Sequence, residues 1–384
     1  MIVFYSIDLS PHIQPLALEV AKIVGFDNFL YVSEIEEPWR GETIETGGIL
    51  HKFRKDASKE LEDCEVLYTG GIRPIDLIER RARRGLKTLY VSERWFKPIR
   101  IGAYFCGRRL GFSLPGWFRM YCPGYRKMMK RFVRAVNEHD SVRFLAIGPH
   151  AKADFIRMGV KEGKIDIWGY FVESGGRLAV SGERLAVSGE RLAILWVGRM
   201  LDWKRVDTII EAVKRLAVSG QRLAVSGQQL AVSEVSQSSN PRLTANDYRL
   251  TATLDIYGTG SEEIRLKQMA HGCEGFIHFY PPVPIQEVRR LMREHDLYVL
   301  ASDENEGWGA VVNEALEEGM HVIGTCEAGA SATMLPGERL FHAGDAEALA
   351  QLLVKEANNG LPPCSIGNWS AKEAAKRLMN ITTN

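Results

Sequence analysis

Short strand-like runs that alternate with amphipathic helices restrict the fold of this chain more than any other feature. In the first half, "MIVFYS" (1–6) precedes the helical pattern "LALEVAKIVG" (16–25), which is followed by "NFLYVS" (28–33). The second half repeats the plan, with "LAILWVGRM" (192–200) before "VDTIIEAVKRL" (206–216). Such alternation is typical of parallel sheets covered by helices. The sequence therefore predicts an α/β protein with two doubly wound, Rossmann-like domains.

The length of the chain also favours two domains. Its 384 residues, 45% of them hydrophobic, are enough to bury a large core that divides in two. We expect a first domain at 1–172, an interdomain linker at 173–190 and a second domain at 191–368. A C-terminal helix is expected at 369–384, with packing back on the first domain as one option. A formal net charge of +1 gives no global indication of a nucleic-acid partner.

A seven-residue repeat interrupts this plan twice, at 177–190 and again at 215–235. Each copy, such as "RLAVSGE", is too short for a solenoid unit, and its Leu and Val lie two apart instead of at coiled-coil spacing. We interpret the repeat as loosely ordered insertion sequence, with an interaction element as the alternative. The second copy is predicted to belong to an insertion at about 215–248, in a helix-to-strand connection that faces away from the ligand crevice.

The lack of a recognisable targeting signal and the spacing of the cysteines both favour a cytoplasmic protein. No apolar run approaches the roughly 20 residues of a membrane span, and residues 1–12 lack the basic start and long apolar stretch of a signal peptide. The six cysteines have no paired metal-binding spacing, which indicates reduced thiols and not a disulfide framework.

Polar residues follow the predicted strands of the second domain, where open α/β sheets bind ligands. Arg199 and Lys204 share one short loop after the strand in "ILWVG". Two neighbouring cations suit a diphosphate, whose negative charge grows as it becomes a leaving group. The chain contains no Asp-x-Asp pair that would hold a metal–diphosphate. We therefore expect protein cations, and no metal, to neutralise the charge.

A second glycine-rich stretch follows the strand in "DLYVLAS". Its residues Gly307, Trp308 and Gly309 precede a predicted helix. Backbone N–H groups at such a position approach phosphate closely, and the helix dipole favours an anion. The sequence thus predicts phosphate chemistry without a P-loop.

The segments that carry these signals resemble a known family. "ILWVGRMLDWKRVDTIIEAV", "LDIYGTGSE" and "LYVLASDENEGWGAVVNEALEEGMHVIGT" look like the nucleotide-binding domain of retaining GT-B glycosyltransferases of family 4. The resemblance is strong over about 190–335 and weaker over 1–170. It implies a GT-B fold, two Rossmann-like domains facing across a cleft, and a hexosyltransferase-type glycosyltransferase (EC 2.4). Such an enzyme moves a sugar from a nucleotide-diphosphate donor to a hydroxyl acceptor with retention, and needs no cofactor.

The resemblance also assigns roles to individual residues. Arg199 and Lys204 match the G-R-x(n)-K element that grips the donor diphosphate, while backbone amides of the glycines at 307–309 hold phosphate. Glu306 and Glu314 match the E-x7-E element, whose first glutamate contacts the donor sugar and whose second contacts the ribose. Because this Glu spacing is common by chance, its place between a strand and a helix gives the motif its weight.

Two further site predictions remain open between a functional and a plain structural role. Gly258 and Gly260 in "GTG" fit either a nucleotide contact or a simple turn. His12 follows the first strand, and family members often supply a histidine from this domain to the sugar. A loop histidine fits equally well, since "DLSPHIQP" departs from the usual glycine-rich loop.

A basic, aromatic segment at 94–134 stands apart from the rest of the first domain. It holds eleven Lys or Arg residues, ten aromatic residues and no acidic residue. This composition suits an anionic membrane surface, so a peripheral position at the inner face of the membrane and a lipid-linked or saccharide acceptor are expected. An exposed basic face over buried aromatics is the structural alternative. RNA binding has no supporting motif, and no nucleic-acid partner is expected.

The function predicted from these observations is sugar transfer in cell-surface polysaccharide or glycolipid synthesis. The alternatives on the same architecture are a sugar-nucleotide epimerase and a sugar phosphorylase. A catalytically silent protein that binds a sugar nucleotide or a membrane is the alternative from a different class.

Overall fold

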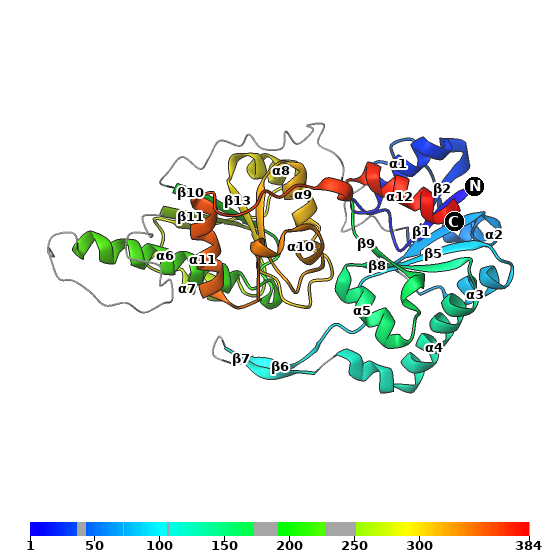
Figure 1. The fold of residues 1–384 in the computed structure, drawn as a ribbon, viewed down its shortest axis with the longest axis horizontal. Helices are drawn as coiled ribbons and strands as arrows, with labels where there is room; N and C mark the ends of the chain where they lie inside the picture. Colours follow the sequence, from blue (N-terminus) through cyan, green and yellow to red (C-terminus); the bar gives the residue numbers. More distant parts are fainter. Residues whose placement is uncertain are drawn as a thin grey trace. The chain divides into compact units, whose positions relative to one another are not determined.

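Two parallel sheets organise the chain (Figure 1). The computed structural model describes residues 1–36, 44–71, 73–105, 108–114, 116–172, 191–226 and 251–383. The first unit comprises Met1–Gly176, Gly307–Glu317 and Ile366–Asn384, and the second comprises Arg177–Glu306 and Glu318–Ser365. The predicted α/β class with two doubly wound units is confirmed. The linker predicted at 173–190, with its copy of the repeat, lies outside the described residues.

The first unit contains a seven-stranded parallel sheet in the order β3-β2-β1-β4-β5-β8-β9. Its strands are β1 (Ile2–Ser6), β2 (Phe29–Ser33), β3 (Leu50–Phe53), β4 (Val66–Gly70), β5 (Lys87–Ser92), β8 (Val142–Ile147) and β9 (Ile165–Trp168). The direction in which successive strands are added reverses between β1 and β4. Ligands of open α/β sheets bind beyond the carboxyl ends of the strands at such a switch point.

Helices cover both faces of this first sheet (Figure 1). They are α1 (Gln14–Val24), α2 (Ser58–Asp63), α3 (Ile75–Arg83), α4 (Pro123–Glu138), α5 (Pro149–Met158) and α12 (Ala371–Thr383). The short helix α9 (Val311–Glu317) is also grouped with this unit. The C-terminal helix α12 packs beside α1. Arg377 of α12 lies over Trp168 and Trp369, with its guanidinium carbon 5.1 and 4.5 Å from the ring centroids. The C-terminal segment is thus part of the first unit's core.

One antiparallel hairpin departs from the doubly wound plan. It consists of β6 (Ile99–Phe105) and β7 (Arg108–Leu114), and it belongs to the basic segment at 94–134. The sequence analysis did not predict it, although Leu110, Phe112 and Leu114 of β7 alternate with Gly111 and Ser113 as in a half-buried strand. The hairpin leads into a short helical turn at Gly116–Tyr121 and then into α4.

The second unit contains a six-stranded parallel sheet in the order β12-β11-β10-β13-β14-β15. Its strands are β10 (Arg191–Val197), β11 (Thr251–Tyr257), β12 (Ile277–Tyr280), β13 (Leu297–Leu300), β14 (His321–Thr325) and β15 (Leu340–Phe341). Its helices are α6 (Val206–Ser226), α7 (Glu263–Met269), α8 (Ile285–Glu294), α10 (Gly329–Met334) and α11 (Ala346–Ala357). The switch point of this sheet lies between β10 and β13.

A buried apolar cluster joins α6, α11 and the central strands of the second unit. It includes Ile210 and Val213 of α6, Leu353 of α11 and Trp196 of β10. These side chains are almost fully buried, and burial of each stabilises the unit by roughly 1.5–3 kcal/mol. The cluster therefore fixes the strands whose carboxyl ends carry the predicted donor-site loops.

The segment Gly307–Glu317, which the sequence analysis assigned to the second domain, is grouped with the first unit by its contacts. Its Trp308 is buried, and the indole lies against Gly169, where an added Cβ would be 2.4 Å from a ring carbon. Trp308 Nε1 donates to Asn313 Oδ1 at 2.7 Å, and Asn313 Nδ2 donates to the Tyr170 carbonyl at 3.1 Å. Packing around one tryptophan thus explains the assignment.

The start of the second repeat copy also differs from the prediction. Helix α6 continues to Ser226, so residues 215–226 are helical and not loosely ordered insertion sequence. Leu216, the first leucine of this copy, is buried in the α6–α11 cluster. A single Gly costs a helix roughly 1 kcal/mol, which good helix formers such as Leu, Ala, Arg and Gln offset. The rest of the insertion, 227–250, lies outside the described residues.

Deleting residues 216–229 should leave the melting temperature nearly unchanged. The deletion removes two copies of the unit, so Leu230 then follows Arg215 and restores Leu at the buried position of Leu216. Shortening a connection changes its closure entropy by only about 0.6 kcal/mol for each halving of length. Thermal unfolding of the two proteins tests this expectation. A matched Leu216→Ala variant should lower stability by about 2–5 kcal/mol, and a comparable loss in the deletion variant would show that the repeat is integral to the fold.

Candidate functional site

The switch point of the second sheet brings together two of the predicted site residues. Lys204 follows β10 and Glu306 follows β13, and the Lys204 ammonium pairs with the Glu306 carboxylate. Both side chains are largely buried, with 20% and 14% of their area exposed. Ser302 Oγ donates a hydrogen bond to Glu306 Oε2 at 3.1 Å. The carboxylate is therefore held by two groups from the two sides of the switch point.

Backbone hydrogen bonds hold the same two loops together. Asp303 N donates to the Trp203 carbonyl at 2.8 Å, next to Lys204 in sequence, and Glu306 N donates to the Asp303 carbonyl at 2.9 Å. Thr325 Oγ1 at the end of β14 donates to the Ser302 carbonyl at 2.5 Å. The ends of β10, β13 and β14 thus form one connected polar edge.

Arg199 lies at the same edge but differs from Lys204. It is exposed, and it directly follows Gly198 at the end of β10. Its backbone carbonyl accepts a hydrogen bond from Leu201 N at 2.8 Å, which turns the chain towards Lys204. Because the Lys204 charge is already offset by Glu306, Arg199 supplies the positive charge of this loop that is most accessible to an anion.

Gly258 and Gly260 have a structural explanation in the close approach of two loops. A Cβ on Gly258 would lie 1.9 Å from the Gly198 carbonyl oxygen, and one on Gly260 would lie 2.3 Å from the Met200 carbonyl oxygen. Met200 N also donates to the Thr259 carbonyl at 2.8 Å. These contacts require glycine for packing, and a nucleotide contact of either residue stays a prediction.

The residues predicted to contact the phosphate and the ribose lie in the segment Gly307–Glu317, which is grouped with the first unit. Trp308 is buried there by packing, while Gly309 has a positive φ of 92° immediately before α9. Glu314 is a buried residue of the first turn of α9. These positions neither establish nor contradict a role in binding the donor, so that role remains a prediction.

A cavity of about 410 Å³ occupies the switch point of the first sheet. Residues that follow β1, β4 and β5 line it, among them His12, Gly71 and Glu93. The His12 ring stacks on Tyr170, with ring centroids 5.5 Å apart. The structure thus places His12 at a ligand-sized cavity, and also gives it the packing contact expected of a structural histidine.

Glu93 is a site residue that the sequence analysis missed. Its carboxylate accepts hydrogen bonds from Tyr170 Oη at 2.9 Å and from Lys97 Nζ at 2.6 Å. An added Cβ on Gly307 would lie 2.2 Å from Glu93 Oε2, so the Glu93 carboxylate packs closely against Gly307 and would have to shift for a larger residue. The signal available in the sequence was the acidic residue directly after the strand "KTLYVS". We therefore add Glu93 and Tyr170 to the candidate site of the first unit.

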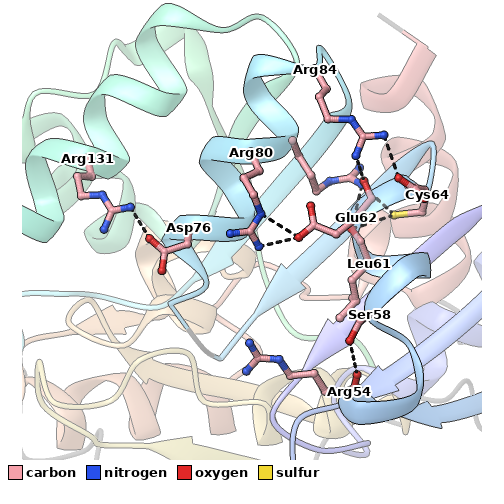
Figure 2. Close-up of polar contacts among 11 residues, drawn as sticks. Arg54, Ser58, Leu61, Glu62, Cys64, Asp76, Arg80, Arg84 and Arg131 are labelled. Atoms are coloured by element: carbon pink, nitrogen blue, oxygen red, sulfur yellow. Dashed lines mark hydrogen bonds and ion pairs between the residues drawn. The ribbon is translucent and has the colours of Figure 1, made fainter.

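A second cavity of the first unit, of about 480 Å³, is lined by three arginines and three acidic residues whose formal charges cancel. Arg54 Nη1 donates to Glu34 Oε1 at 2.6 Å. Arg80 binds Glu62 Oε1 through Nε and Nη2 (Figure 2). Asp76 instead pairs with Arg131 of α4 (Figure 2). Alternating hydrogen-bond donors and acceptors without net charge suit a neutral polyhydroxylated ligand.

The family of the second unit follows from its sequence. Residues 191–359 match the family model described as glycosyl transferases group 1. This part of the chain is a group 1 glycosyltransferase domain. The match includes Arg199, Lys204, Glu306 and Glu314, and the protein is accordingly a glycosyltransferase (EC 2.4). A comparison with curated protein sequences finds no significant match.

Solved structures of glycosyltransferases share the fold of the whole chain. The lipopolysaccharide outer core galactosyltransferase WaaB, in its apo form, superposes with a TM-score of 0.62 at 13% identity, covering 100% of this chain and 99% of WaaB. A glycosyltransferase from Rickettsia africae gives 0.59 at 15% identity, covering 100% and 97%. Anabaena HepE in complex with UDP gives 0.56 at 14% identity, covering 100% and 94%. The fold is therefore GT-B, as predicted.

The Lys204–Glu306 pair should show energetic coupling in a double-mutant cycle. Because both groups are largely buried, we expect Lys204→Met and Glu306→Gln to be non-additive by about 1–3 kcal/mol in the free energy of unfolding. Chemical denaturation of the wild type, both single variants and the double variant measures this term. The exposed pair Lys267–Glu263 of α7 is the matched control and should couple by no more than about 0.5 kcal/mol. Equal coupling in the two pairs would contradict the buried arrangement.

Proposed function

We propose that this glycosyltransferase moves a hexosyl group from a nucleotide-diphosphate donor to a hydroxyl acceptor with retention at the anomeric carbon. The observation that carries the proposal is the Lys204–Glu306 pair at the switch point of the unit that matches the group 1 family. A cation and a carboxylate at this edge match the two charged parts of the reaction, the diphosphate leaving group and the sugar hydroxyls. A solved structure of HepE in complex with UDP-glucose supports a nucleotide sugar as donor.

The predicted donor-binding residues would divide the work as follows. The exposed Arg199 makes the first contact with the diphosphate. Lys204 stabilises the negative charge that develops on the diphosphate as its bond to the sugar breaks. Glu306 accepts hydrogen bonds from the sugar hydroxyls, and binding of donor exchanges its contact with Lys204 for contacts with the sugar. Glu314 binds the ribose, and the backbone at Gly258, Gly260, Gly307 and Gly309 approaches the nucleotide. No metal is needed, because protein cations neutralise the leaving group.

The first unit supplies the acceptor side of the proposal. The cavity beside His12, Glu93 and Tyr170 offers a histidine, a carboxylate and a phenol to hydroxyl groups. The second cavity, around Arg54 and Arg80, has lining charges that cancel, and it suits further sugar units of the acceptor. A saccharide or lipid-linked acceptor fits both cavities, and this agrees with a role in cell-surface polysaccharide or glycolipid synthesis.

The donor assignment predicts specific losses of activity. Arg199→Ala and Lys204→Ala should each lower transfer at least about tenfold, since a charge-assisted contact to diphosphate contributes roughly 1.5–3 kcal/mol. Glu306→Gln should impair turnover more than nucleotide binding, and Glu314→Gln the reverse. Thermal shift with UDP-, GDP- and ADP-sugars identifies the donor, and NMR of the product reports its anomeric configuration.

The control and the contradicting outcomes are equally specific. Lys267→Ala removes an exposed lysine of the same unit and should leave transfer unchanged. Wild-type turnover in all four site variants would contradict the donor site, and a product of inverted configuration would contradict retention. Cleavage of a glycoside that depends on phosphate would indicate a phosphorylase, and interconversion of the free nucleotide sugar would indicate an epimerase. Nucleotide-sugar binding without turnover would indicate a catalytically silent protein.

The basic segment supports a further part of the proposal, binding to an anionic membrane surface. Trp117, Phe118 and Tyr121 form an aromatic cluster whose outer members are exposed, Tyr121 with 70% of its area. Arg126, Lys127 and Lys130 on the following helix α4 are also exposed. Aromatic rings beside basic residues are the composition that binds at an anionic lipid interface. No helix among the described residues is long and apolar enough to span a membrane.

One residue of the basic segment has a different role. Arg131 pairs with Asp76 and Glu79 of α3 and so joins two helices of the first unit. It contributes to the fold, and a test of membrane binding should leave it in place.

Replacing Arg126, Lys127 and Lys130 with Gln should release the protein from anionic vesicles. Each basic residue near the surface contributes about 1 kcal/mol, so the triple variant should bind roughly 100-fold more weakly. Co-sedimentation with phosphatidylcholine vesicles with and without phosphatidylserine measures the effect, which should weaken with added salt. Gln at the exposed Lys59, Lys161 and Lys372 is the matched control. Binding that ignores lipid charge would leave the segment as an exposed basic face over buried aromatics.

A further inference from the structure

Three side chains that ligate metals converge at the carboxyl edge of the second sheet. Cys326 and Glu327 follow β14, and His342 follows β15. His342 Nδ1 lies 3.0 Å from Cys326 Sγ and 3.0 Å from Glu327 Oε1, and Cys326 Sγ lies 3.4 Å from Glu327 Oε2. Within the described part of the chain, they are the only group of three Cys, His, Asp or Glu residues with ligand atoms this close.

The backbone holds these three residues in place. Cys326 N donates to the Phe341 carbonyl at 3.0 Å, which joins the ends of β14 and β15. Ala343 N donates to Glu327 Oε2 at 3.1 Å, which orients the carboxylate towards His342. The ligand atoms therefore come from two adjacent strand ends that are already fixed to one another.

The spacing of the ligand atoms is close to that of a tetrahedral site. Bonds of about 2.0–2.3 Å to nitrogen, oxygen and sulfur place tetrahedral ligand atoms about 3.3–3.7 Å apart. The observed 3.0–3.4 Å needs an outward shift of only a few tenths of an ångström. With an exposed fraction of 81%, the His342 side chain is free to make that adjustment.

We propose that Cys326, Glu327 and His342 bind one zinc ion, with water as the fourth ligand. Zinc accepts this mixture of sulfur, nitrogen and oxygen ligands, whereas calcium and magnesium prefer oxygen alone. Binding replaces the proton of the Cys326 thiol, which is released to solvent, and forms the Zn–S bond with the thiolate. The thiolate and carboxylate together balance the two positive charges of the ion.

A catalytic Cys–His pair is the competing interpretation of the same geometry. Nucleophilic cysteines lie in electropositive surroundings that stabilise the thiolate. Here the Glu327 carboxylate lies 3.4 Å from Cys326 Sγ and 3.0 Å from His342 Nδ1, so it would repel a thiolate unless a cation lay between the three groups.

The zinc ion would stabilise the edge that carries the candidate donor site without taking part in transfer. Cys326 follows Thr325, whose hydroxyl donates to the Ser302 carbonyl, and Ser302 in turn donates to Glu306. The ion would join β15 to this connected edge. Its role is structural, and it is independent of the proposed donor and acceptor.

Zinc binding by the full-length protein tests the site directly. After chelator treatment, titration of Zn²⁺ against a chromophoric chelator should give one bound ion per chain, and zinc should raise the melting temperature. Cys326→Ser and His342→Ala should each weaken zinc binding at least about 100-fold. Substitution with Co²⁺ should give the thiolate charge-transfer and tetrahedral d–d bands, and both should disappear in Cys326→Ser.

The controls separate this site from binding by any accessible thiol. Cys122→Ser removes an exposed cysteine at the start of α4 and should leave stoichiometry and affinity unchanged. His342→Ala alters an exposed side chain, so its loss of zinc binding would not reflect misfolding, and circular dichroism checks this. Failure of the wild type to bind one ion, or unchanged binding in both ligand variants, would overturn the proposal.

Discussion

The ion pair between Lys204 and Glu306 forms because the strand order of the second sheet brings the two residues together, and it is the central charged contact of the candidate donor site. The two residues lie 102 positions apart in sequence, and they meet because β10 and β13 are neighbours at the switch point. A parallel sheet places all its carboxyl ends at one edge, so loops from distant parts of the chain converge there. The pair keeps a cation and a carboxylate in a largely buried position before any ligand binds. Such preorganisation limits the rearrangement that is needed when charge develops on a leaving group.

Most of the fold could be predicted from the sequence, because long elements carry a clear hydrophobic period. The strands at Ile2–Ser6 and Leu297–Leu300 are continuous apolar runs, as expected for strands covered on both faces. The elements that were missed are short or peripheral. Leu50–Phe53 and Leu340–Phe341 are edge strands of four and two residues, too short to show a period. The grouping of Gly307–Glu317 with the first unit was also missed, since it depends on where Trp308 packs and not on any local pattern.

The candidate site was predictable only where its residues follow a recognisable strand. Lys204 and Glu306 were found in this way, and the structure brings them together. Glu93 and Tyr170 were missed, because their significance comes from a hydrogen bond between residues 77 positions apart. The Cys326–Glu327–His342 group was invisible for the same reason, since no metal-binding spacing connects a cysteine to a histidine on the next strand. For Gly258 and Gly260 the structure adds a packing explanation that sequence alone could not distinguish from nucleotide binding.

The repeat shows how a fold can accept inserted sequence where the insert both forms a helix and presents apolar residues to the existing core. Seven residues advance an α-helix by about 20° less than two full turns, so a seven-residue unit preserves the face of the helix it extends. Helix α6 already packs Ile209, Ile210 and Val213 against α11, and the first leucine of the repeat joins them. Strand β11, which follows the insertion, begins at Thr251 beside Arg191, at the end of the sheet opposite the carboxyl ends that carry Lys204 and Glu306. Added residues there therefore extend an existing helix and leave the ligand-binding edge of the sheet unaltered.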